Sequence, residues 1–107
     1  MWTIWSTMDA VVVVFHLPTG TPLKVHKDFR RKVYGEATSS WKGRYRYRRK
    51  GVLDGIPHVF LYWGVVIINR RDLPALRDIL DHYSAIIHVR TVITIRGDEI
   101  VLGRSLN

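Results

Sequence analysis

The sequence predicts one α+β domain, built from a mainly antiparallel sheet of four to five strands with two helices packed on it. Its length of 107 residues is that of one compact domain, and 47% of the residues are hydrophobic against 24% charged, as in ordinary globular proteins. Stretches rich in β-branched residues alternate with two stretches in which apolar residues recur at helical spacing. No repeat or linker divides the sequence, so we expect residues 1–107 to fold together.

The N-terminal part of the domain is predicted to be a buried strand followed by a basic helix. The run AVVVVFHL (10–17) is typical of a strand buried on both faces, and PTGTP (18–22) has the composition of a turn. Residues 24–35 have an apolar residue at every fourth position, which predicts a helix that ends at Gly35. The apolar stripe of this helix is Val25, Phe29 and Val33. We expect EATSS (36–40) to be a short polar link.

The middle of the chain predicts hairpins of an antiparallel sheet. WKGRYRYRRKGVL (41–53) alternates basic and aromatic residues over its centre, which favours a strand. DGIP (54–57) is typical of a turn. HVFLYWGVVIIN (58–69) is strongly β, and we expect a turn or bulge to interrupt it at Gly64.

The C-terminal part predicts a second helix and further strands. Asp72 is a candidate helix cap, and Pro74 is tolerated in the first turn that follows. The buried face of the helix should consist of Leu73, Leu76, Ile79, Leu80 and Tyr83. AIIHVRTVITI (85–95) favours a strand, RGDE (96–99) a turn, and IVLG (100–103) a last short strand or tail.

Positive charge is concentrated in one quarter of the chain. The formal net charge is +8, yet residues 1–23 carry −1 and residues 51–107 carry 0. Residues 24–50 therefore carry +9, from eleven basic residues against only Asp28 and Glu36. A segment of one sign repels itself, and the partner that would compensate it is a polyanion.

The stretch RYRYRRK (44–50) makes this partner more specific. In a strand, alternate side chains point to opposite faces. One face then holds Arg44, Arg46 and Arg48, and the other holds Tyr45, Tyr47 and Arg49. Either the tyrosines pack on the core while the arginines face phosphates, or the tyrosines form a stacking platform with arginines at its rim or on a neighbouring subunit. An ordinary solvated strand face is disfavoured, because no acidic residue occurs between Glu36 and Asp54.

Aromatic residues among basic ones are what single-stranded nucleic acid requires, since bases stack on rings and Lys or Arg holds the backbone. The chain has no glutamine, and its basic helix lacks the polar set that reads base edges in duplex DNA. Candidate phosphate contacts are Lys24, Lys27, Arg30, Arg31, Arg44, Arg46, Arg48, Arg49 and Lys50. Candidate base-stacking residues are Trp41, Tyr45 and Tyr47, with Phe29 and Trp63 as weaker ones. For Tyr62 and Trp63, which lie in an apolar run, core packing is the favoured interpretation.

The segments VHKDFRRKVYG (25–35) and YRYRRKGVLDGIPHVFLYWGVVIINRRDL (45–73) resemble the archaeal ThermoDBP-type single-stranded DNA-binding proteins and their short relatives. The resemblance implies an α+β unit that binds single-stranded DNA through basic and aromatic side chains and assembles into oligomers. DNA is favoured over RNA on this resemblance alone. Longer members append a leucine zipper, whereas this sequence has no heptad pattern. We therefore expect a homodimer or homotetramer formed through the domain itself, with 10–17 and 59–68 as candidate edges.

Features of other protein classes are missing from the sequence. There is no cysteine, no glycine-rich phosphate loop, and no metal-binding spacing among the five histidines. We expect neither a cofactor nor enzymatic activity. Two alternatives stay open: a small basic endoribonuclease of the RelE toxin type, and a ribonucleoprotein component that binds folded RNA. In the first, His26, close to Lys27 and Arg30, would take part in the cleavage.

The sequence also favours a cytoplasmic protein adapted to heat. It lacks cysteine and glutamine and has only two asparagines, Asn69 and Asn107, which fits a thermophilic source. The apolar segment 59–68 is too short to span a bilayer, and the N-terminus lacks the basic start of a signal peptide.

Overall fold

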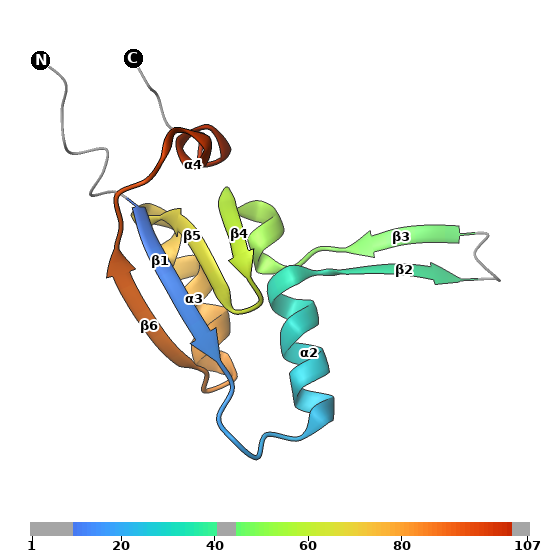
Figure 1. The fold of residues 1–107 in the computed structure, drawn as a ribbon. Coiled ribbons are helices and arrows are strands. Elements are labelled where there is room, and N and C mark those ends of the chain that lie inside the picture. Colours follow the sequence, from blue (N-terminus) through green and yellow to red (C-terminus); the bar gives the residue numbers. More distant parts are fainter. Residues whose placement is uncertain (1–9, 41–44, 104–107) are drawn as a thin grey trace, which may run out of the picture.

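The computed structural model describes residues 10–40 and 45–103, and it describes only the backbone of residues 37–40 and 45–48. Within these ranges it contains a four-stranded antiparallel sheet, a separate two-stranded hairpin and three α-helices. Figure 1 shows that the hairpin projects away from the rest of the molecule. The predicted α+β class with an antiparallel sheet is therefore confirmed.

The sheet has the Val-rich strand at its centre. Its strands, in spatial order, are β4 (His58–Tyr62), β5 (Val65–Asn69), β1 (Ala10–His16) and β6 (Ile86–Thr91). All neighbours are antiparallel, with Val12 opposite Ile67 of β5 and Arg90 of β6. The predicted interruption at Gly64 is confirmed as the turn between β4 and β5. The prediction that 10–17 offers an edge to another subunit was wrong, because β1 is paired on both sides; β4 and β6 are the outer strands.

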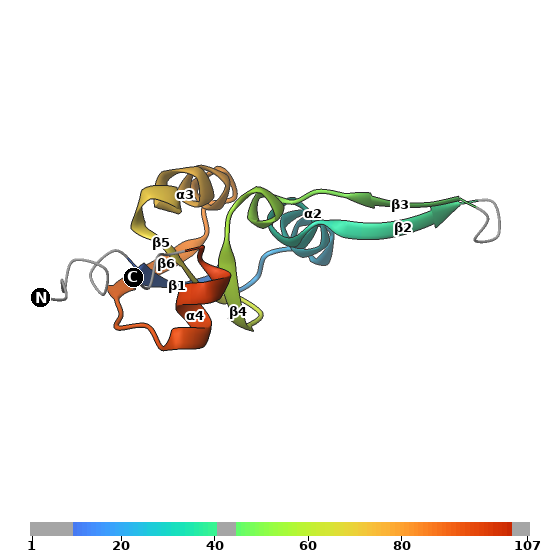
Figure 2. The ribbon, with the colours of Figure 1, turned by 90° about the horizontal axis from the view of Figure 1, so that it is seen from above.

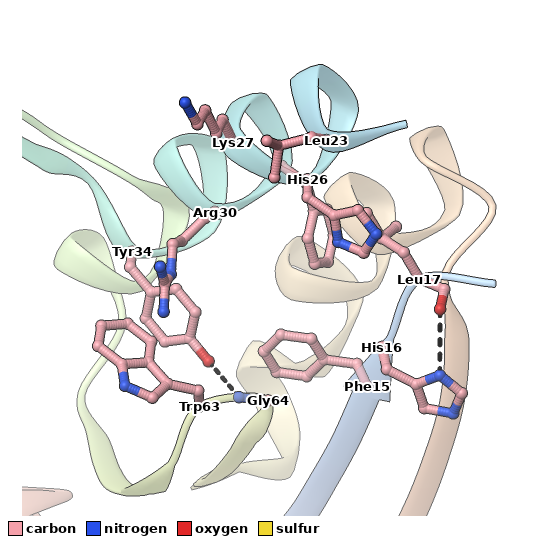
Figure 3. Close-up of a pocket in the computed structure, with 11 residues that line it drawn as sticks. Phe15, His16, Leu17, Leu23, His26, Lys27, Arg30, Tyr34, Trp63 and Gly64 are labelled. Atoms are coloured by element: carbon pink, nitrogen blue, oxygen red, sulfur yellow. Dashed lines mark hydrogen bonds between the residues drawn. The ribbon is translucent and has the colours of Figure 1, made fainter. Parts of the chain in front are cut away.

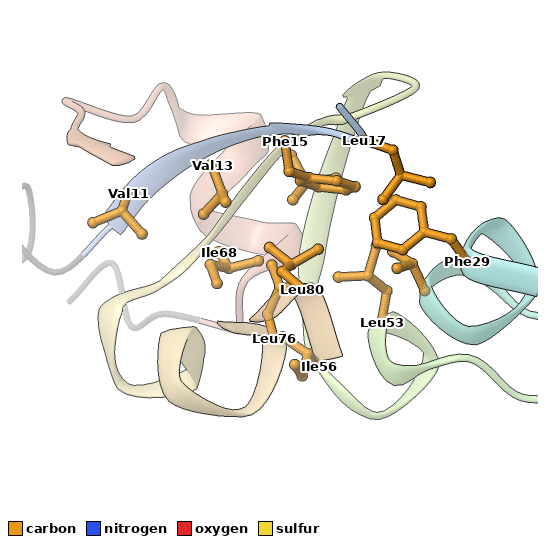
Figure 4. Packing of buried hydrophobic residues seen from close by; sticks show 12 residues of the cluster. Val11, Val13, Phe15, Leu17, Phe29, Leu53, Ile56, Ile68, Leu76 and Leu80 are labelled. Carbon is orange, nitrogen blue, oxygen red and sulfur yellow. The ribbon is translucent and has the colours of Figure 1, made fainter. Parts of the chain in front are cut away.

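One face of the sheet forms the main core with two helices, α2 (Leu23–Tyr34) and α3 (Leu73–His82). From β1, the side chains of Val11, Val13 and Phe15 point into this core (Figure 4). The helices contribute to this core the apolar stripes that their spacing predicted. The fully or nearly fully buried residues of these stripes are Phe29, Val33, Leu76 and Leu80. Asp72 occupies the cap position of α3 as predicted, but its side chain makes no capping hydrogen bond.

The third helix, α4 (Arg96–Val101), lies on the opposite side of the sheet from α3 (Figure 2). It is followed by Leu102, which is buried against Ala10 and Ile67. The Asn69 side-chain amide donates a hydrogen bond of 3.1 Å to the Leu102 carbonyl oxygen. The predicted turn at 96–99 and strand at 100–103 were therefore wrong, because burial of Leu102 and this hydrogen bond hold a helix against the sheet instead.

The hairpin consists of β2 (Glu36–Ser40) and β3 (Tyr45–Arg49), and we call it the arm. Its strands are antiparallel, with Glu36 opposite Arg49 and Ser40 opposite Tyr45. Two sequence predictions were wrong here. The EATSS link is a strand, because the basic strand supplies a backbone partner, and the strand predicted for 41–53 is shorter. After the arm, Val52–Gly55 forms a 3₁₀ helix, η1.

Candidate nucleic-acid interface

The basic side chains of α2 lie on its outer surface. Burial of Phe29 and Val33 fixes the rotation of the helix, so Lys24, Lys27 and Arg30 are exposed. On the inner side, Asp28 accepts a hydrogen bond from the Tyr83 hydroxyl at the end of α3. This carboxylate is therefore engaged between the two helices.

The arm begins where α2 ends, and the backbone just before β2 lies in tight contact with the backbone that follows β3. Gly35 ends α2 with φ 81° and donates its N–H to the Arg31 carbonyl oxygen at 2.8 Å. A Cβ atom on Gly51, just after β3, would lie 2.3 Å from the Gly35 nitrogen and 2.5 Å from the Val33 carbonyl oxygen. Gly51 N–H in turn donates to Asp54 Oδ2 of η1 at 2.8 Å. These contacts anchor the arm to the C-terminal end of α2.

A cleft of about 480 Å³ opens between α2, the end of β1 and the β4–β5 turn. Figure 3 shows its lining side chains. They are Phe15, His16, Leu17, Leu23, His26, Lys27, Phe29, Arg30, Tyr34, Trp63 and Gly64. None of these residues is acidic. The cleft thus combines aromatic and aliphatic walls with basic groups.

Aromatic rings from α2 and the β4–β5 turn form one wall of the cleft, and a ring of β4 packs against this wall. Trp63 lies edge-to-face with Tyr34 and with Phe60, at centroid distances of 4.8 and 5.1 Å. The Tyr34 hydroxyl accepts a hydrogen bond of 2.6 Å from the Gly64 N–H. Burial raises the pKa of Tyr34, while this hydrogen bond and the positive charge of Arg30 oppose the rise. The wall is therefore held together by ring packing and by one hydrogen bond to the turn.

Replacing Gly64 in the β4–β5 turn with any other residue would displace the aromatic wall. Gly64 has φ 84°, and a Cβ atom there would lie 2.5 Å from the Phe15 carbonyl oxygen. Glycine therefore allows the turn to approach β1 closely. The adjacent Trp63 is held over the end of the sheet, where 51% of it stays exposed.

Arg30 connects the aromatic wall to the basic surface of α2. The central guanidinium carbon of Arg30 lies 4.2 Å from the centroid of the Trp63 ring. This distance is that of a cation–π contact, which is worth about 0.5–1 kcal/mol at an exposed site. A guanidinium stacked in this way keeps N–H groups at its edge to pair with a phosphate.

A second hollow of about 360 Å³ lies at the base of the arm, and we call it the basal hollow. Its lining residues are Lys27, Arg30, Arg31, Gly35 and Glu36. Arg31 Nε lies 3.4 Å from Glu36 Oε2, an exposed ion pair. Lys27 and Arg30 line both hollows. The basic surface is therefore continuous from the aromatic cleft to the root of the arm.

Two predicted roles for aromatic residues were wrong. Phe29 cannot stack with a base, because it is 7% exposed and packs edge-to-face against Phe15 and Tyr83 in the core. Conversely, Tyr62 and Trp63 do not pack in the core. They are 69% and 51% exposed, because the hairpin turn places them beyond the part of β4 that is half-buried.

The remaining predicted residues fall into three groups. Lys24, Arg49 and Lys50 are exposed but line neither hollow. Trp41 and Arg44 lie outside the described residues. For Tyr45, Arg46, Tyr47 and Arg48 only the backbone is described, as part of β3. The structure thus brings Lys27, Arg30, Arg31 and Trp63 together.

Sequence reasoning missed Tyr34, Phe60 and Phe15 as parts of the site. Tyr34 directly precedes the predicted helix end and stands one residue after the buried Val33, a position that turns it toward the β4–β5 turn. In the same apolar run, core packing was predicted for Tyr62 and Trp63, and no role was predicted for Phe60. The signal that could have placed it outside is Gly64, since aromatic residues beside a hairpin turn lie at the end of a sheet.

Two features of other protein classes do not occur in the described residues. In the described ranges, no group of three or more His, Asp or Glu residues could hold a metal ion. Likewise, no helix in the described part of the chain is long and apolar enough to cross a membrane.

No protein-family model, curated protein or solved structure was found to match this chain. The similarity to ThermoDBP-type proteins therefore stays a prediction, and the interpretation of the site depends on its own geometry and charge.

Proposed function

We propose that this protein binds single-stranded nucleic acid with little sequence preference and without enzymatic activity, and that the nucleic acid it binds is DNA. The observation that carries the proposal is the position of Lys27 and Arg30, which line both the aromatic cleft and the basal hollow. A flexible polyanion lying along this surface would meet basic groups throughout and an aromatic wall at one end. Single strands, unlike duplexes, have bases free to use such a wall.

The charge distribution supports an extended path for the strand. Residues 24–50, which carry the net charge of +9, include the arm and nearly all of α2. Of the two acidic residues in this segment, Asp28 accepts a hydrogen bond from Tyr83, and Glu36 pairs with Arg31. The excess of basic groups is thus left to an external partner.

The salt dependence of binding tests the proposal. With poly-dT, about six neutralised phosphates would give log K against log salt a slope near −4, at roughly −0.7 per contact. Replacing both Lys27 and Arg30 with Ala should make the slope less negative by about 1.4. Arg77→Ala is the matched control, because this exposed arginine lies on α3, 3.8 Å from Asp81. A wild-type slope near zero would contradict the proposal.

One observation supports the endoribonuclease as a second candidate: His26 lines the cleft beside Lys27 and Arg30. Incubation with labelled RNA separates the two functions. Cleavage that disappears in His26→Ala would favour the nuclease, whereas intact RNA favours binding alone. Competition between poly-dT and structured RNA at equal salt would identify a ribonucleoprotein component instead. A cytoplasmic location and assembly into a homodimer or homotetramer remain expectations, with β4 or β6 as the available edge strands.

A further inference from the structure

The cleft combines aromatic walls, which suit a planar group, with two basic side chains, which suit a negative charge beside it. Resting on the proposed function, we infer that one unstacked base of the bound strand enters the cleft, while the neighbouring phosphates contact Lys27 and Arg30. The cleft volume of about 480 Å³ lies within the range of small-ligand sites, roughly 300–1,000 Å³. It is therefore large enough for a single nucleotide unit.

Opposite walls of the cleft suit the two faces of a base. Figure 3 shows Tyr34 and Trp63 on one side, and His26 with Leu17 on the other, while Phe15 lies between them. The Tyr34 and Trp63 rings come from different elements and stand edge-to-face at 4.8 Å. Flat rings and an imidazole are the side chains on which bases stack, whatever the base, because every base has a π face.

The charge of the lining residues favours an anionic ligand. Lys27 and Arg30 line the cleft, and none of the lining residues is acidic. Free phosphate would use these cations but leave the aromatic wall unused, and a neutral apolar group would use the wall but leave the cations unpaired. A nucleotide within a strand uses both. Arg30 lies on Trp63, so its side chain is already held beside the aromatic wall.

The cleft is preformed by backbone contacts away from its mouth. The Gly64 N–H donates to the Tyr34 hydroxyl at 2.6 Å, and the Phe15 N–H donates to the Gly64 carbonyl oxygen at 2.8 Å. These bonds tie α2, β1 and the β4–β5 turn together. A preformed site loses little conformational entropy when it binds, which favours capture of a base from a flexible strand.

The test compares two labelled oligomers of equal length at equal salt: oligo-dT and the corresponding abasic deoxyribose-phosphate chain. Wild-type protein should bind oligo-dT more tightly. In Trp63→Ala the ratio of the two affinities should fall by at least about fivefold, which is the lower end of the range for losing one stacked base. The affinity for the abasic chain should stay within about twofold of the wild-type value. Tyr62→Ala is the matched control, because this neighbouring exposed ring does not line the cleft.

The outcomes separate this inference from the proposed function. If wild-type protein binds neither oligomer, the proposed function fails. If it binds both, and Trp63→Ala weakens both equally or neither, the base site alone is overturned. A second measurement uses the unmodified protein, so it does not depend on how the variant folds: ultraviolet crosslinking to an oligomer that contains bromouracil. Crosslinks to Tyr34 or Trp63 support the inference, and crosslinks confined to the arm overturn it.

Discussion

Tyr83 joins α2 to α3 through its hydroxyl, which donates a hydrogen bond to Asp28. The ring also packs edge-to-face against Phe29 at a centroid distance of 5.2 Å. Burial, together with the Asp28 carboxylate, raises the pKa of Tyr83 to about 12 from its ordinary 10. The residue that holds the basic helix in place is therefore itself sensitive to high pH.

The pKa of Tyr83 predicts how stability depends on alkaline pH. In the unfolded chain the Tyr83 phenol loses its proton near pH 10. In the folded chain its pKa is about 12, so it keeps the proton until the pH approaches that value. The contribution of this hydroxyl to the free energy of unfolding is therefore complete below pH 10 and is lost as the pH rises to about 12. Tyr83→Phe removes the contribution, so the stability difference between wild type and variant should narrow over this range. Urea unfolding at several pH values measures it; a constant difference would contradict the assignment.

The root of the arm depends on the closeness of Gly35 and Gly51. Gly51→Ala would place a Cβ atom 2.3 Å from the Gly35 nitrogen, and the atoms in its way belong to the backbone. We expect a loss of at least about 1–3 kcal/mol in the free energy of unfolding, as in other overpacked sites. Thermal or urea unfolding measures it.

Gly55→Ala is the matched control for this substitution, because a Cβ atom at Gly55 meets nothing within 4 Å. Its effect should stay within about 0.5 kcal/mol, as for ordinary surface changes. If the two substitutions change stability equally, the close contact between Gly51 and Gly35 is not what anchors the arm.

The elements that the sequence predicted best are those with a complete apolar pattern. β1 and the buried stripes of α2 and α3 were predicted from residues that the core then contains, such as Val13, Phe29 and Leu80. The strand β2 could not be predicted, because EATSS has no apolar pattern and becomes a strand only by pairing with β3. The helix α4 is six residues long and includes Gly97, so helical spacing gave no signal.

The basic residues of the candidate site could be predicted from the sequence better than its aromatic residues. Lys27, Arg30 and Arg31 follow from the buried stripe of α2, which leaves them outside. Trp63 was assigned mainly to the core, because an apolar run does not reveal where its turn lies relative to the sheet end. The cation–π pair of Arg30 and Trp63 joins residues 33 positions apart in the sequence, and only the packing of α2 beside the β4–β5 turn brings them together.

Considered as a whole, the molecule divides into a nearly neutral sheet and a basic side. Residues 51–107, which supply most of the sheet, carry no net charge, whereas residues 24–50, which include the arm and nearly all of α2, carry +9. Because the arm projects from the end of α2 (Figure 1), the backbone of its basic strand, β3, extends beyond the body of the protein. A strand bound in the cleft would need sufficient length to reach the arm.

This geometry predicts that the role of the arm depends on the length of the DNA. An oligo-dT of about four nucleotides, the low end of known site sizes, should contact the cleft and the helix alone, whereas one of about sixteen should also reach the arm. Replacing Arg46 and Arg48 with Ala should then leave the short oligomer unaffected. For the long oligomer it should make the salt slope less negative by about 1.4, at roughly 0.7 per lost phosphate contact. Lys27→Ala, in contrast, should lower the affinity of the protein for both oligomers. Anisotropy titrations over a salt series measure all four cases. If the arm substitutions lower the affinity for both oligomers equally, the arm and the cleft do not lie at opposite ends of the bound strand.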